Sequence, residues 1–180
     1  MEELTEIIEE ATARVGEEYF RLKIDGGDSI YRERVYCYEL YHQMRCRWPT
    51  NTPFLVQGEV DKSRHPMFPP ELWKIPDFLI HTPGEMKGNY TIIEVKHSKA
   101  KNENIKDDLE KLSLFQSQVG YQRAIYLVYG DEAADCAKRV IDRAEKFQEL
   151  EPIELWLHKE SGKSAVRYTT LQRTNTIGGR

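Results

Sequence analysis

Two carboxylates and a lysine interrupt two short apolar segments of this chain. Asp77 follows Pro76 in the first segment, and Glu94 and Lys96 flank Val95 in the second. A pair of carboxylates can bind Mg²⁺, which takes one or two from the protein and leaves its other positions to water and phosphate. A cation held in this way polarises a phosphate and lowers the pKa of a bound water. Lys96 could orient that water or stabilise charge on the phosphate oxygens, so the three residues suit cleavage of a phosphodiester bond.

Both segments have the composition of β-strands. Residues 74–81 form an apolar run that ends at a Thr-Pro-Gly turn, and residues 90–96 are rich in β-branched and aromatic side chains. Because side chains alternate along a strand with a period of two, Glu94 and Lys96 point to the same face. We therefore expect a hairpin that brings Asp77 close to both of them.

A simpler interpretation of Glu94 and Lys96 is a solvated charge pair on an exposed strand. Such pairs are common and contribute little to stability. The neighbouring Ile92 and Ile93 indicate burial, however, and charged residues are seldom buried unless they are paired or bound to a metal. The apolar setting of Asp77 points the same way, so the sequence favours a site over a surface pair.

With Pro76-Asp77 on one strand and Glu94-Val95-Lys96 on the next, the chain resembles the PD-(D/E)XK nuclease superfamily. The resemblance implies an α/β fold, namely a restriction-endonuclease-like three-layer α/β/α core with a mixed central sheet. It also implies Asp77, Glu94 and Val95 around Mg²⁺, for which Mn²⁺ can substitute, and Lys96 as the catalytic lysine. Many members carry a further acidic residue on the N-terminal helix.

Glu39 is our candidate for this further acidic residue, both as a metal ligand and as a catalytic residue. It lies in an aromatic stretch of a predicted helix, which suggests burial, although a pair with a nearby arginine is the alternative. Glu59, at the end of the strand before the motif, competes for the same role or belongs to a solvated turn.

The remaining elements follow the order of the superfamily core. The apolar spacing predicts helices over residues 105–119 and about 132–150, and a helix that begins near Asp28 or Ser29 and runs towards Trp48. An amphipathic helix is expected at about 1–22, and residues 174–180 are expected to form a flexible tail. Strands are predicted at 54–60, 124–129 and 153–158, in addition to the motif hairpin.

Composition limits the other possibilities. A chain of 180 residues predicts a single domain, residues 1–180. The three cysteines lack the spacing of a zinc site, no glycine-rich phosphate loop indicates a nucleotide cofactor, and no apolar stretch approaches the length of a membrane span. The N-terminal residues are acidic, unlike a signal peptide, so a cytoplasmic location is expected.

The sequence thus predicts a Mg²⁺-dependent deoxyribonuclease that acts in DNA restriction, defence or repair. The net charge of −4 argues against a free-standing high-affinity DNA binder, so a homodimer or a partner protein is expected to help target the domain to DNA. The alternative is a non-catalytic nucleic-acid-binding or scaffold subunit of a larger complex that retains the fold. The sequence does not distinguish DNA from RNA as the substrate, nor endonucleolytic from exonucleolytic cutting.

Overall fold

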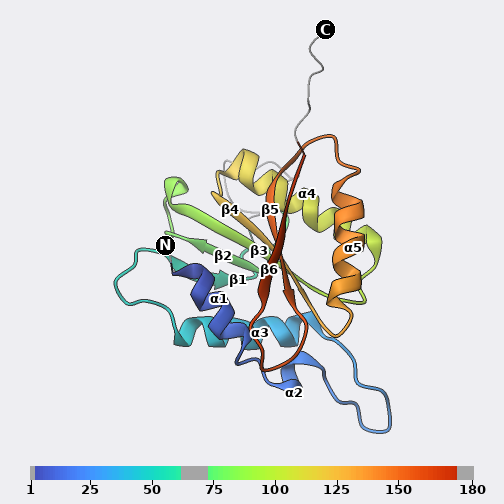
Figure 1. Ribbon diagram of the computed structural model, residues 1–180. Coiled ribbons are helices and arrows are strands. Elements are labelled where there is room, and N and C mark those ends of the chain that lie inside the picture. The colour runs from blue at the N-terminus through green and yellow to red at the C-terminus, as the bar shows by residue number, and fades with distance from the viewer. Residues whose placement is uncertain (1–2, 62–72, 174–180) are drawn as a thin grey trace.

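The protein is built around one mixed six-stranded sheet. The computed structural model describes residues 3–61 and 73–173. The strands lie in the order in which they occur in the chain, β1-β2-β3-β4-β5-β6 (Figure 1). They are β1 (Leu55–Gly58), β2 (Phe78–His81), β3 (Asn89–His97), β4 (Arg123–Tyr129), β5 (Leu150–His158) and β6 (Val166–Arg173).

The direction of pairing changes across the sheet. Strands β1, β2 and β3 pair antiparallel, and Phe78 of β2 lies opposite Ile93 of β3. Strands β3, β4 and β5 run parallel, and β6 closes the far edge antiparallel to β5. The motif strand β3 therefore lies inside the sheet, between an antiparallel and a parallel neighbour.

Helices cover both faces of the sheet (Figure 1). One buried apolar cluster joins α4 and α5 to one face through Leu109, Leu112 and Val140. A second cluster joins α1, α2 and α3 to the other face. The helices are α1 (Leu4–Thr12), α2 (Glu17–Phe20), α3 (Glu33–Cys46), α4 (Asn102–Val119) and α5 (Ala133–Ala144), and a short 3₁₀ turn, η2 (Met86–Gly88), precedes β3.

The helix between the two central strands illustrates how the sequence determines an element. In α4 the buried side chains Ile105, Leu109, Leu112 and Phe115 recur at helical spacing, so one face of the helix packs on the sheet. Gly120 ends the helix in a left-handed conformation with φ of 82°, which glycine adopts without a steric cost. A helix here is what a crossover between the parallel strands β3 and β4 requires.

The architecture confirms an α/β class with a mixed sheet, but several predicted boundaries were wrong. The expected N-terminal helix over 1–22 is broken at Gly16, which is extended and separates α1 from α2. The third helix begins at Glu33 because Ile30 instead pairs with Leu22 in an isolated bridge. Strand β6 was not predicted, since most of its residues are exposed and polar, and the tail 174–180 lies outside the described residues.

Two further boundaries differ from the expected ones. The helix expected at about 132–150 ends at Ala144, after which residues 150–158 form β5.

Across residues 3–61 and 73–173, no helix is both long and apolar enough to cross a membrane.

Candidate functional site

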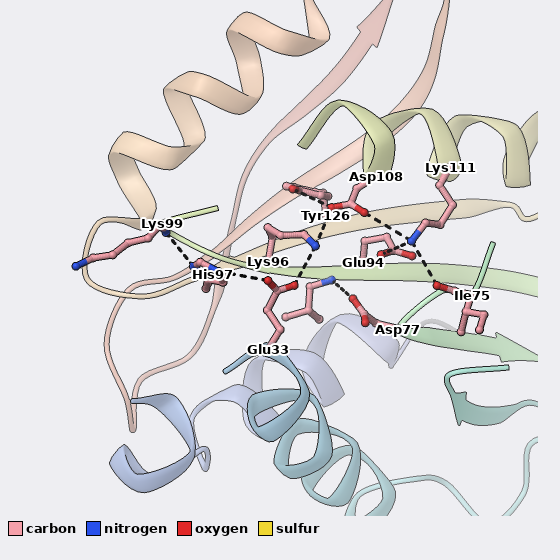
Figure 2. Close-up of polar contacts among 11 residues, drawn as sticks. Glu33, Ile75, Asp77, Glu94, Lys96, His97, Lys99, Asp108, Lys111 and Tyr126 are labelled. Atoms are coloured by element: carbon pink, nitrogen blue, oxygen red, sulfur yellow. Dashed lines mark hydrogen bonds and ion pairs between the residues drawn. The ribbon is translucent and has the colours of Figure 1, made fainter. Parts of the chain in front are cut away.

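The hairpin of β2 and β3 brings the two motif carboxylates together, as the sequence predicted. Asp77 immediately precedes β2, and its Oδ2 accepts a hydrogen bond of 2.7 Å from the main-chain N–H of Val95 (Figure 2). Glu94 and Val95 are consecutive residues of β3, so this bond fixes the carboxyl group of Asp77 beside the strand that carries Glu94.

Lys96 lies between carboxylates from two different helices. Its Nζ is 2.9 Å from Oε2 of Glu33, the first residue of α3, and 3.1 Å from Oδ2 of Asp108 on α4 (Figure 2). Glu33 also approaches His97, with 3.5 Å between Oε1 and Nε2. The side chain of Lys96 is therefore held from both sides, and its ammonium group is fixed in position.

A second lysine, Lys111 of α4, contacts the other motif carboxylate. Its Nζ is 2.9 Å from Oε2 of Glu94, 3.6 Å from Oδ1 of Asp108, and 3.3 Å from the carbonyl oxygen of Ile75 (Figure 2). Asp108 thus lies between the two lysines. These ion pairs join five residues, and Asp77 lies close enough to repel Glu94; we call the six residues the carboxylate–lysine cluster: Glu33, Asp77, Glu94, Lys96, Asp108 and Lys111.

The alternation of side chains along β3 explains this arrangement. Glu94 and Lys96 point towards α4, whereas Ile93 and Val95 pack in the apolar cluster on the opposite face. Glu94 is only 2 % exposed. In the described part of the chain its Oε1 is buried without a hydrogen-bond partner, although an unpaired buried oxygen of this kind is costly. A ligand that binds this oxygen would remove that cost.

The cluster carries an excess of negative charge. Its four carboxylates and two ammonium groups sum to −2 when all six are ionised. Burial raises the pKa of Asp77 to about 6, against the lowering effects of the Val95 N–H and the two lysines. Burial, followed by repulsion from Asp77, raises the pKa of Glu94 well above its usual range. The two motif carboxylates therefore hold protons more tightly than free side chains do.

The pKa values of the two lysines are raised as well, by the carboxylates around them. Burial alone would lower the pKa of each, but Asp108 and Glu33 raise that of Lys96 above its ordinary value, and Glu94 does the same for Lys111. Both therefore stay protonated near neutral pH. His97 differs, because burial and the neighbouring Lys96 lower its pKa.

The residues present fit one divalent cation. Mg²⁺ binds through one or two carboxylates, and the unpaired Oε1 of Glu94 and the four carboxylates that face only two lysines are both suited to it. Asp77 would be the second carboxylate. Across residues 3–61 and 73–173, no group of three or more His, Cys, Asp or Glu side chains is placed to hold a metal ion, so any such ion would depend on this pair, on main-chain oxygens and on water.

The other predicted residues lie as follows. Val95 is fully buried on the opposite face and has no donor atom in its side chain, so only its main-chain carbonyl could serve as a ligand. Glu39 is half-buried and accepts a 2.6 Å hydrogen bond from Gln43. Glu59 forms an exposed pair with Arg34, with 3.0 Å between Nε and Oε1.

The acidic residue that α3 contributes to the cluster is Glu33, whereas Glu39 lies six residues further along the helix. Six residues rotate a helix by about 240°, which turns the two side chains to different sides. The aromatic neighbours of Glu39 suggested burial, yet Tyr38 is exposed. The buried face of α3 follows Cys37, Leu40 and Met44, and Glu33 precedes Cys37 by one turn.

Sequence reasoning also missed Asp108 and Lys111. Both could have been found from the helical pattern of α4, because Asp108 follows the buried Ile105 by three residues and Lys111 follows Asp108 by three more. The signal in the sequence is a carboxylate and a lysine beside the apolar face of α4, the helix that packs on the motif strand.

Comparison with protein-family models, with curated proteins and with solved structures gave no significant match. The assignment of a function therefore depends on the residues of the site and on the arrangement of the strands and helices that carry them.

Proposed function

We propose that the protein is a Mg²⁺-dependent nuclease with a restriction-endonuclease-like core, and that DNA is its substrate. The observation that carries the proposal is that Asp77, held by the Val95 N–H, lies close enough to Glu94 to repel it, in a largely buried cluster of four carboxylates and two lysines that includes Lys96. Burying carboxylates in this way costs stability, so a protein that gains nothing from them would be expected to lack them.

The arrangement of the elements supports this proposal. The motif lies in an antiparallel three-stranded portion, β1 to β3, and a crossover helix, α4, leads to the parallel strand β4. This is the order of elements that the resemblance to the PD-(D/E)XK superfamily implies. The preceding helix α3 contributes Glu33, which contacts Lys96, whereas Glu39 was the acidic residue expected from this helix.

The roles of the side chains follow from their contacts. When bound at Asp77 and Glu94, a divalent cation would polarise the phosphate and supply an activated water. Glu33 and Asp108 hold the ammonium group of Lys96 in one place, where it stabilises negative charge on a phosphate oxygen. Lys111 neutralises Glu94 until substrate and cation arrive.

Cleavage of labelled nucleic acids tests the proposal directly. Single-stranded, duplex and branched DNA, with RNA as a comparison, are incubated with the protein in Mg²⁺ or Mn²⁺ and in EDTA. We expect cutting that requires the metal and is lost in Lys96→Ala and Asp77→Asn. Lys138→Ala, on the exposed surface of α5, is the matched control and should keep full activity. Circular dichroism of each variant shows whether it is folded.

The alternative function, a non-catalytic nucleic-acid-binding or scaffold subunit, predicts a different outcome. Such a protein would bind nucleic acid without cutting it, and its binding would not require Mg²⁺. Folded wild-type protein that cuts none of these substrates, and whose melting temperature does not change with Mg²⁺ or Mn²⁺, would contradict the nuclease proposal.

A further inference from the structure

A cavity of about 340 Å³ lies directly beside the carboxylate–lysine cluster, between α3 and the strands β1 and β2. Asp77 belongs to both, so the cavity adjoins one of the two carboxylates proposed to hold the cation. The cavity is lined by Cys37, Tyr38, Tyr41, Gly58, Glu59, Asp77 and Phe78.

Aromatic side chains form much of the cavity wall. The rings of Tyr41 and Phe78 lie nearly parallel, with 7° between their planes and 6.4 Å between their centroids. Tyr38 is 62 % exposed, so much of its ring is accessible to a ligand. Flat aromatic walls and an exposed tyrosine are the features on which nucleobases stack.

The charges of the lining exclude an anion. Two acidic residues, Asp77 and Glu59, belong to the cavity lining, and no lysine or arginine does so among the described residues. A phosphate would be repelled here, whereas an uncharged ring that carries N–H groups could donate hydrogen bonds to a carboxylate. The cavity therefore suits the base of a nucleotide and not its phosphate.

The backbone at Glu59 connects the cavity to the site. Glu59 has φ of 48°, a conformation that costs energy for a residue with a side chain, and its N–H donates a 3.1 Å hydrogen bond to the carbonyl oxygen of Asp77. Gly58 precedes it, so no side chain projects into the cavity from that position. The outer wall is thus fixed relative to Asp77, and Arg34 orients the Glu59 carboxylate from outside.

We propose that this cavity binds a nucleobase next to the phosphate that is cleaved, with Tyr38 stacking on the base and Glu59 accepting a hydrogen bond from its amino group. The inference rests on the proposed nuclease function, because it places the phosphate at Asp77 and Glu94. It adds a preference for bases with an exocyclic amino group over thymine.

Binding of a hydrolysis-resistant oligonucleotide tests the inference separately from catalysis. A short single-stranded phosphorothioate DNA with bases, and the same backbone with abasic sugars, are titrated in Mg²⁺ against wild type, Tyr38→Ala and Tyr168→Ala. Tyr168 on β6 is a similarly exposed tyrosine outside the cavity lining and serves as the matched control. A 2-aminopurine base in the same strand reports stacking through quenching of its fluorescence.

Wild type and Tyr168→Ala should bind the strand with bases about 5- to 100-fold more tightly than the abasic strand, the range expected for one stacked base. Tyr38→Ala should lose most of this difference and the quenching. Glu59→Gln should keep the stacking and lose the preference for adenine, cytosine or guanine over thymine.

Three outcomes would overturn the inference: equal binding of both strands by wild type, no binding of either strand, or an unchanged difference in Tyr38→Ala. The third outcome includes equal weakening of both strands in Tyr38→Ala, since Tyr38 would then contact the backbone. These outcomes are independent of cleavage. A protein that cuts DNA but binds it independently of the bases would support the proposed nuclease function and contradict the nucleobase site. A protein that binds bases through Tyr38 but does not cut DNA would support the nucleobase site and contradict the nuclease function.

Discussion

Replacing Asp77 by asparagine should stabilise the protein at alkaline pH although it removes a proposed metal ligand. Burial raises the pKa of Asp77 to about 6 in the folded protein, against 3.8 for a free side chain. The folded state therefore binds this proton more tightly than the unfolded chain does. Protonation of Asp77 contributes stability as the pH falls from about 6 towards 4, and above pH 6 the charged carboxylate costs stability.

The size of the effect follows from this difference in pKa. A difference of about 2 corresponds to about 3 kcal/mol in the free energy of unfolding. This is an upper value, because the residue is only half-buried and water screens part of the charge. Asparagine has the shape of the protonated acid and can still accept the hydrogen bond from Val95 N–H. We therefore expect Asp77→Asn to be more stable than wild type by about 1–3 kcal/mol at pH 8 and nearly equal to it at pH 4.

Urea unfolding followed by circular dichroism, in EDTA from pH 4 to pH 8, measures this difference. The exposed Asp142 provides a matched control, and Asp142→Asn should follow wild type at every pH. The reasoning would be refuted if Asp77→Asn were no more stable than wild type at pH 8, or if the advantage of the variant grew as the pH fell.

Three further predictions concern the same cluster. Saturating Mg²⁺ or Mn²⁺, at about 100 times its dissociation constant, should stabilise the wild type by about 2.7 kcal/mol. At pH 6, where Asp77 is partly protonated, binding should also release protons, and calorimetry should find neither effect in Glu94→Gln. Lys111→Ala should lower the free energy of unfolding in urea by about 3–5 kcal/mol, because it leaves Glu94 buried without its partner. Adding Glu94→Gln to this variant should restore much of the lost stability. A small loss in Lys111→Ala alone would contradict the ion pair between Lys111 and Glu94. Glu33→Gln should lower kcat of DNA cleavage by about tenfold or more, because Glu33 positions Lys96. Glu39→Gln should cut DNA at the wild-type rate, because Glu39 contacts Gln43 outside the cluster. A larger loss of activity in Glu39→Gln than in Glu33→Gln would return the catalytic role to Glu39.

The central part of the fold could be predicted from the sequence because its signals are local. Strand β3 is a long β-branched run and β4 a continuous apolar one, so both were located closely. The period of two also placed Glu94 and Lys96 on one face, as the structure confirms. Strand β6 gave no such signal, since only Leu171 is buried along it and its pairing with β5 is a tertiary contact.

The composition of the cluster was harder to predict than its centre. Asp77, Glu94 and Lys96 are close in sequence and share a recognisable motif. Glu33 and Asp108 reach Lys96 only because two helices pack on the sheet, and the distances that result depend on how each helix is rotated. Glu39 was chosen for its aromatic neighbours, which describe composition and carry no information on which side of α3 faces the sheet.

The carboxylate–lysine cluster draws its members from segments that are synthesised at very different times. Glu33 emerges from the ribosome before Lys111 of α4, and the ion pairs Glu33–Lys96 and Lys111–Glu94 form only when α3 and α4 have both packed on the sheet. A nascent chain that stops before α4 carries the whole sequence motif but lacks Asp108 and Lys111. If the protein is a nuclease, such an incomplete chain has no ordered lysine with which to cut nucleic acid. Nuclease activity would then appear only after the complete domain has folded.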